Sequence, residues 1–177
     1  TPHGEMGYNY LKKRELSEET MHKFGLGYSG KNGAALVQYL KQKGFEDELI
    51  KEAGLATYSE KYGMTSQFFN RVMYPISDVH GKVIGFGGRV MGNAEPKYLN
   101  SPETPVFDKS RNLYGLNFAR TARKNNIILC EGYMDVIALH QAGFIQAVAS
   151  LGTAFTAGQA NLLRRYTENV LLAYDSD

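Results

Sequence analysis

Apolar residues recur in a strand, helix, strand, helix, strand order between residues 126 and 177. Apolar runs at 127–130, 145–150 and 169–174 have the length of buried strands, and two stretches with helical spacing separate them. Such alternation is typical of a parallel α/β sheet. Because parallel strands end at a common edge of the sheet, the residues that follow each run are expected to meet there.

The pattern before residue 122 is mixed. Residues 5–60 predict short amphipathic helices, with Ser17 and Asn32 as N-terminal caps and glycines as stops. Residues 72–77 and 82–90 predict two strands of a hairpin around the turn 78–81, and residues 113–122 predict an apolar helix.

Acidic residues follow two of the runs in the C-terminal part. Glu131 comes directly after the first run, and Asp175 and Asp177 follow the last. Packed carboxylates repel one another unless a cation lies between them, and Mg²⁺ is a hard ion that accepts a few carboxylates and keeps water or phosphate at its other positions. A metal site is therefore predicted at this edge; the alternative for Glu131 is a cap on the next helix.

Composition limits the other classes. Hydrophobic residues make up 43% and charged residues 21% of the 177, as in ordinary globular proteins, and a net charge of +2 confines any nucleic-acid surface to a local patch. The single cysteine, Cys130, excludes an internal disulfide and suits a reducing compartment. With no apolar run of about 18 residues and no signal-peptide pattern, we expect a cytoplasmic protein without a membrane partner.

Glycine alternates with larger residues on the strand 82–90. Val83, Gly85, Gly87 and Arg89 share one face, which predicts a smooth floor with a guanidinium at its end. Nucleic-acid backbone or phosphate is one candidate occupant, and another packed strand or helix is the alternative.

Polar and aromatic residues gather in the proline-rich stretch 95–105. Lys97, Tyr98 and Asn100 supply a cation, a ring and an amide, a mixture that suits single-stranded nucleic acid, although a solvated loop fits them as well. Lys109 and Arg111 lie just before the predicted helix 113–122, where positive charge opposes the helix dipole, so a separate role for them is expected.

Three segments resemble the TOPRIM domain of bacterial primases, type IA and II topoisomerases and some nucleases: 131–136 (EGYMDV), 149–153 (ASLGT) and 174–177 (YDSD). The resemblance implies that Glu131, Asp175 and Asp177 hold Mg²⁺, with Mn²⁺ as an alternative, and that residues 123–177 form the first half of such a domain. Asp135 lies one helical turn after Glu131, in a position where an acid also favours the helix start, so a catalytic role and a capping role both stay open.

Further segments resemble bacterial primases of the DnaG type, in the family's order: 71–76 (RVMYPI), 85–90 (GFGGRV), 96–104 (PKYLNSPET) and 113–116 (LYGL). The resemblance implies an α/β protein, with a mixed α+β basic subdomain at 1–122 before the partial TOPRIM sheet at 123–177. It implies that Arg89, Lys97 and Asn100 contact template or nucleotide. Arg71, Tyr98, Lys109 and Arg111 lie in matching basic segments with less defined roles.

The implied activity is synthesis of short RNA primers on single-stranded DNA from ribonucleoside triphosphates. A zinc-binding domain and a helicase-interaction domain belong to such proteins, but one cysteine cannot build a zinc site here, and the replicative helicase would bind through a region absent from this chain. Other TOPRIM phosphodiester enzymes, and a non-catalytic fragment that binds nucleotide or single-stranded DNA, are the alternatives. The chain starts without Met and stops after 175–177 (DSD), so we expect a piece of a longer protein.

Overall fold

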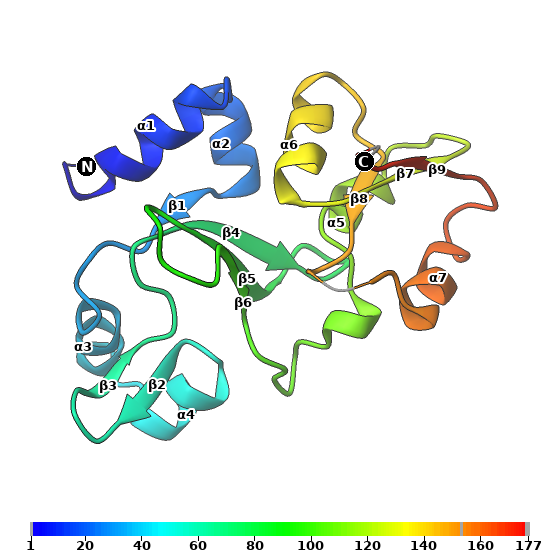
Figure 1. The fold of residues 1–177 in the computed structure, drawn as a ribbon. Coiled ribbons are helices and arrows are strands. Elements are labelled where there is room, and N and C mark those ends of the chain that lie inside the picture. The colour runs from blue at the N-terminus through cyan, green and yellow to red at the C-terminus, as the bar shows by residue number, and fades with distance from the viewer. Residues whose placement is uncertain (1, 153, 176–177) are drawn as a thin grey trace.

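Two main sheets lie side by side in the computed structural model, which describes residues 2–152 and 154–175 (Figure 1). An antiparallel sheet has the strand order β1-β4-β5-β6, a parallel sheet has the order β8-β7-β9, and β2 pairs with β3 as a separate hairpin. The strands are β1 (Gly27–Tyr28), β2 (Ala56–Ser59), β3 (Gly63–Ser66), β4 (Arg71–Ser77), β5 (Val83–Val90), β6 (Tyr98–Asn100), β7 (Ile127–Cys130), β8 (Ala147–Ala149) and β9 (Val170–Ala173). The predicted fold class, a mixed α+β part followed by a parallel α/β sheet, is confirmed.

The helices are short. They are α1 (Glu5–Lys13), α2 (Glu18–Phe24), α3 (Ala35–Gln42), α4 (Asp47–Glu52), α5 (Leu116–Ala119), α6 (Tyr133–Gln141) and α7 (Ala157–Leu163), with 3₁₀ turns η1 (Pro2–Gly4) and η2 (Lys109–Arg111). Ser17 caps α2 as predicted, because its hydroxyl accepts from the backbone N–H of Thr20, and Gly25 ends that helix at φ 64°. Among the described residues, no helix has the length and apolar character needed to span a membrane.

Two helix predictions were wrong in detail. α3 begins at Ala35 after Ala34, and Asn32 instead accepts a bond from the Ala34 backbone N–H. The helix predicted at 113–122 is reduced to α5, because Tyr114 forms a β-bridge with Ala149 and Gly115 then turns the chain at φ 82°. Pairing with a residue 35 positions away in the sequence thus prevents residues 113–115 from forming the helix that their apolar spacing predicted.

The antiparallel sheet is built around β4, which has one fully buried face and one partly buried face. Val72, Tyr74 and Ile76 are fully buried. Strand β5 pairs with β4 as predicted, and Asp78 holds the turn by accepting from the backbone N–H groups of His80 and Lys82. The outer strand β6 then pairs with β5 through Arg89 opposite Tyr98 and Gly87 opposite Asn100.

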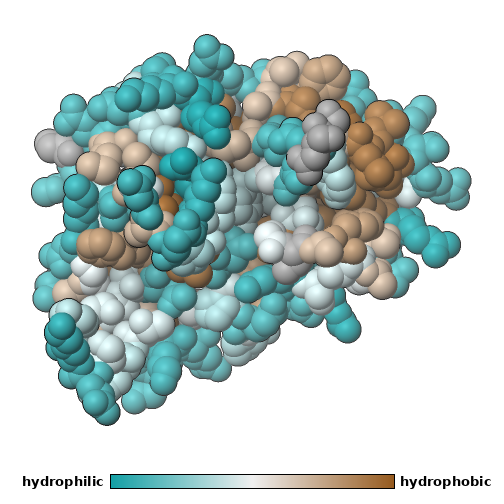
Figure 2. Space-filling view, viewed as in Figure 1, coloured by the Kyte–Doolittle hydropathy of each residue, from teal (hydrophilic) through white to brown (hydrophobic). Residues whose placement is uncertain are grey.

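The parallel sheet has β7 at its centre. Cys130 lies opposite Ala149 of β8 on one side and opposite Ala173 of β9 on the other. Strand β8 is fully buried, whereas Leu171 and Leu172 of β9 are 52% and 70% exposed. Hydrophobic residues therefore gather at the surface over β9 (Figure 2).

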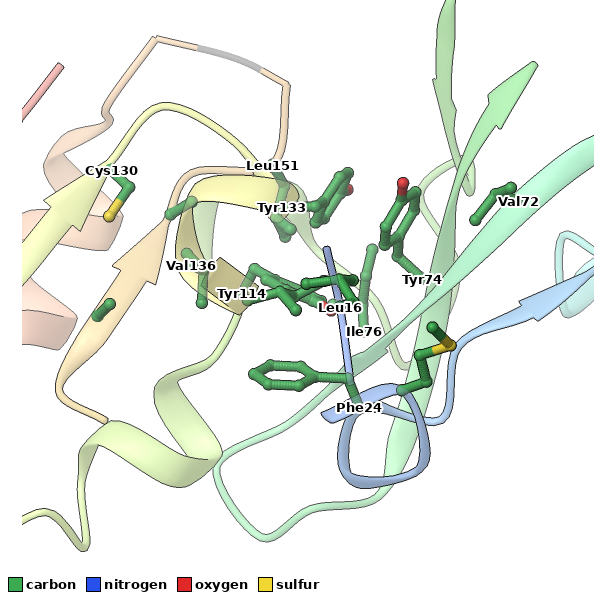
Figure 3. Close-up of a cluster of buried hydrophobic side chains, with 14 of the residues drawn as sticks. Leu16, Phe24, Val72, Tyr74, Ile76, Tyr114, Cys130, Tyr133, Val136 and Leu151 are labelled. Atoms are coloured by element: carbon green, nitrogen blue, oxygen red, sulfur yellow. The ribbon is translucent and has the colours of Figure 1, made fainter. Parts of the chain in front are cut away.

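Aromatic side chains join the two sheets. The ring of Tyr133, at the start of α6, stacks on Tyr74 of β4 with centroids 5.2 Å apart and meets Tyr114 edge-on at 4.7 Å (Figure 3). Phe24 of α2 stacks on Tyr114 from the other side. Because these rings belong to one buried cluster, the start of α6 is held at a fixed place against the antiparallel sheet.

Candidate metal and nucleic-acid site

Glu131 and Asp175 lie at the same edge of the parallel sheet. Glu131 directly follows β7, Asp175 follows β9 by two residues, and the two strands are parallel neighbours with Cys130 opposite Ala173. Both acids are exposed. Burial raises the pKa of Tyr174, the residue before Asp175, and the charge of Glu131 adds to that rise, in agreement with a position of Glu131 close to the end of β9.

Asp177 was predicted as a third acid of this edge, but it lies outside the described residues. Two hard carboxylate oxygen donors fit Mg²⁺, which takes few protein ligands and keeps several waters. Within residues 2–152 and 154–175, no three His, Cys, Asp or Glu side chains come close enough together to hold a metal ion. A magnesium site at this edge, with Glu131 and Asp175 as part of its ligand set, stays a prediction.

Asp135 makes a hydrogen bond that gives it a structural role at the start of α6. Its Oδ2 accepts from the backbone N–H of Gly132 at 3.0 Å, which caps the start of α6. Its charge also adds to the effect of burial in raising the pKa of Cys130 to about 11. Cys130 is thus a buried thiol of the core, in agreement with the sequence, and a catalytic role of Asp135 stays a prediction.

The glycine face of β5 is filled by the protein's own rings. A Cβ atom placed on Gly85 would lie 3.1 Å from the ring of Phe107, and one on Gly87 would lie 2.7 Å from the ring of Tyr133. Gly87 thus faces a packed helix, as the alternative predicted, whereas Gly85 faces a side chain from the segment between β6 and η2. Gly87 lets the start of α6, and with it the end of β7, approach the antiparallel sheet closely.

Arg89 lies beside two residues of the N-terminal segment that the sequence did not single out. The Arg89 guanidinium carbon lies 4.6 Å from the ring centroid of Tyr10, and Arg14 Nε donates to Tyr10 Oη at 3.3 Å. Burial raises the pKa of Tyr98, while the positive charges of Arg89 and Arg14 act in the opposite direction. Both guanidinium groups therefore lie near β6. Tyr10 and Arg14 lie four positions apart at the end of α1. This spacing is common in helices and does not by itself indicate a functional site.

Arg71, a candidate for nucleic-acid binding from the resemblance, is buried in the structure. It is only 6% exposed, and its Nη1 donates to the carbonyl oxygens of Gly88 at 3.1 Å and Pro96 at 2.9 Å. Burial lowers the pKa of its guanidinium. In this structure Arg71 supports the segment that leads into β6, because buried carbonyl groups require donors.

Asn100 links β6 to the acidic edge. Its Oδ1 accepts from Tyr133 Oη at 2.5 Å, and its Nδ2 donates to the Leu151 carbonyl at 2.7 Å. Tyr133 lies two residues after Glu131, so this hydrogen bond fixes β6 relative to the end of β7. On the same segment, Lys97 is exposed and Tyr98 is 40% exposed.

Lys109 and Arg111 form part of η2. Arg111 is exposed and lies 3.5 Å from Asp108, and the carbonyl of Lys109 accepts from Gln159 of α7 at 3.0 Å. Gln159 is fully buried and also donates to the Asn112 carbonyl at 3.0 Å. The backbone of η2 is thus fixed to α7, while the Arg111 side chain stays at the surface.

Comparison with known proteins agrees with this arrangement. Residues 1–120 match the family model for the N-terminal domain of the DNA primase catalytic core, and residues 128–177 match a Toprim-like model. The DNA primase of Clostridium acetobutylicum is 50% identical over 172 residues, and that of Deinococcus radiodurans is 45% identical over 173. These alignments cover 95% and 96% of this chain but 28% and 30% of the relatives.

Solved structures show the same similarity. The DnaG primase catalytic domain bound to single-stranded DNA is 45% identical with a TM-score of 0.86, over 97% of this chain and 56% of that one. The Aquifex aeolicus primase with its zinc-binding and RNA polymerase domains is 40% identical with a TM-score of 0.88, over 95% of this chain and 42% of that one. Two thirds of the chain match a single family model, and the chain belongs to the family of DNA primase catalytic cores.

Proposed function

We propose that this chain is part of a primase core that copies single-stranded DNA into short RNA primers by magnesium-dependent nucleotidyl transfer. The family match supports the activity. The observation that carries the proposal is the link from Glu131 through Tyr133 to Asn100, since it joins an acidic sheet edge to β6, which directly follows the exposed Lys97.

In the proposed reaction, a ribonucleotide 3′-hydroxyl attacks the α-phosphorus of a nucleoside triphosphate. A new P–O bond forms, the bond to the β-phosphate oxygen breaks, and pyrophosphate leaves. Mg²⁺, when bound, lowers the pKa of the attacking hydroxyl and balances the charge of the leaving group. Glu131 would accept the hydroxyl proton or coordinate the metal ion, and Asp175 and Asp177 would be metal ligands.

The cations would bind the polyanionic substrates. Lys97 and Arg89 would neutralise phosphate charge, Tyr98 of β6 would offer a face for a base, and Asn100 holds β6 in place through its bond to Tyr133. Lys109 and Arg111 extend the cationic surface along η2. Arg71 acts from beneath by holding the Pro96 and Gly88 carbonyls.

The proposed partners are a single-stranded DNA template, ribonucleoside triphosphates and the growing RNA primer. A related catalytic domain has been solved with single-stranded DNA, and the Mycobacterium tuberculosis domain with a duplex that carries a 6-nucleotide overhang. The replicative helicase is proposed to bind a region outside these 177 residues, and the compartment is proposed to be the cytoplasm.

The test is a template-dependent primer assay with Mg²⁺ on this chain and on a longer polypeptide of the length of its relatives. Glu131→Gln is expected to lower primer synthesis by about 100-fold or more, because a group that acts on the transferred proton or the metal contributes at least that much. Binding of single-stranded DNA should stay nearly unchanged. Glu60→Gln, at an exposed position in the β2–β3 turn, is the matched control.

Parallel loss of synthesis and DNA binding in Glu131→Gln would contradict the catalytic assignment. Activity of the longer polypeptide with none in this chain would favour the alternative that the 177 residues bind nucleic acid without chemistry. No activity in either would contradict the proposal.

A further inference from the structure

Five cations gather at the edge of the parallel sheet opposite Glu131 and Asp175. Two segments carry them: 120–126, which leads into β7, and 164–169, which leads into β9. The cations are all exposed, and they are Arg120, Arg123, Lys124, Arg164 and Arg165. We call them the amino-edge patch.

The fold holds the two segments together. The Asn125 carbonyl accepts from Thr167 Oγ1 at 3.2 Å and from Asn169 Nδ2 at 3.3 Å, and the Ile127 N–H donates to the Asn169 carbonyl at 3.0 Å. Helices α5 and α7, which precede the segments, share one buried apolar cluster. Figure 1 shows the two connections at the end of the sheet away from the C-terminus.

The patch differs in charge from the rest of the chain. Segments 120–126 and 164–169 contain five cations and one acid, Glu168, which gives +4, whereas all 177 residues sum to +2. The remaining residues therefore sum to −2. The patch thus carries a local excess of positive charge on a chain that is otherwise slightly acidic. Such an excess is typical of surfaces that bind a polyanion.

Helix capping explains only part of the patch. Arg120 and Arg164 are the C-terminal caps of α5 and α7, where positive charge is favoured. Arg123, Lys124 and Arg165 lie beyond those caps. Within the described part of the chain, none of the five cations lies within ion-pair distance of a carboxylate.

We propose that the amino-edge patch binds the sugar–phosphate backbone of a nucleic acid, at a place separate from the acidic edge. The four residues of β7 separate the two places, and they span about 13 Å at strand spacing. A strand bound in the primer-synthesis site would thus need further nucleotides to reach the patch. Only one aromatic residue, Tyr166, lies in the two segments, so the contact is with phosphate and independent of sequence.

The test measures the salt dependence of binding to a fluorescent single-stranded oligonucleotide and to its duplex. The variant is the triple Arg123→Gln, Lys124→Gln, Arg165→Gln. The matched control is the triple Lys31→Gln, Lys43→Gln, Lys61→Gln, which removes the same charge from exposed sites elsewhere. Circular dichroism of all three proteins checks that the fold is kept.

The patch triple should lower the slope of log K against log salt concentration by about 2 for the single strand or about 3 for the duplex, and the control triple should change it by less than about 1. The form that shows the full change expected for it is the nucleic acid that the patch binds, and either result supports the proposal. Equal changes in the two triples, or no change in either, would overturn it.

The inference does not depend on the proposed chemistry. Glu131→Gln added to each protein should leave the slopes unchanged, so a failure of primer synthesis and a failure of the patch are measured separately. A patch triple that loses affinity for anionic phospholipid vesicles while keeping its DNA slope would assign the surface to membranes and contradict the proposal.

Discussion

The antiparallel and parallel sheets differ in how their strands are covered. Central strand β4 is fully buried at Val72, Tyr74 and Ile76, and the glycine face of β5 is filled by Phe107 and Tyr133. The outer strand β9 of the parallel sheet pairs with β7 but leaves Leu171 and Leu172 more than half exposed. Strand β5, which carries Arg89, is therefore held by packing, whereas Asp175 depends on the backbone pairing of one edge strand.

Core truncation should separate the two sheets most clearly. Ile76→Ala removes a fully buried side chain and is expected to lower the free energy of unfolding by about 2–5 kcal/mol. Leu172→Ala removes a side chain that is 70% exposed and should cost less than about 1 kcal/mol. Urea unfolding followed by circular dichroism measures both, and similar losses would contradict the contrast between the sheets.

The close contact between Gly87 and Tyr133 gives a second test of how the antiparallel sheet is packed. Gly87→Ala would place a methyl group 2.7 Å from the Tyr133 ring, and we expect a loss of about 1–3 kcal/mol because the ring is packed on Tyr74. Gly27→Ala is the control, since no atom lies within 4 Å of its added Cβ and its φ is not in the left-handed region. Urea midpoints should fall only for Gly87→Ala, and an unchanged midpoint there would show that Tyr133 does not depend on the glycine.

A smaller effect is expected from the hydroxyl groups of two stacked tyrosines. Tyr133→Phe keeps the ring but loses the bond to Asn100, at a cost of about 1 kcal/mol in the free energy of unfolding. Tyr74→Phe removes a buried hydroxyl that has no hydrogen-bond partner among the described residues, so its stability should stay the same or rise. A larger loss in Tyr74→Phe than in Tyr133→Phe would contradict the proposed link.

The smallest effect is expected at the exposed cation of the β6 segment. Lys97→Ala should weaken single-strand binding, more in low salt than in high, and lower the salt slope by about 1, as one phosphate contact requires. Lys61→Ala, in the β2–β3 turn, controls for loss of charge alone. Unchanged affinity of Lys97→Ala at both salt concentrations would remove Lys97 from the site.

The sequence predicted the elements whose signals are local. Alternating apolar runs predicted β7 and β9, and strand direction then placed Glu131 and Asp175 at one edge. Contacts between residues that are distant in sequence were not predicted. Examples are the Arg89 guanidinium over the Tyr10 ring and the β-bridge between Tyr114 and Ala149. The resemblance placed Arg71 in a basic segment with a less defined role, and the structure shows it buried, where neighbouring carbonyl groups accept its hydrogen bonds.

The most direct test of the acidic edge is paramagnetic broadening by Mn²⁺ in the amide spectrum of isotopically labelled protein. We expect broadening first at residues 131–133 and 174–175 and then at 98–100, because Glu131, Asp175 and β6 would border one ion. In Glu131→Gln this broadening should be lost. Broadening at 131–133 without 174–175, or at neither, would contradict a shared metal site.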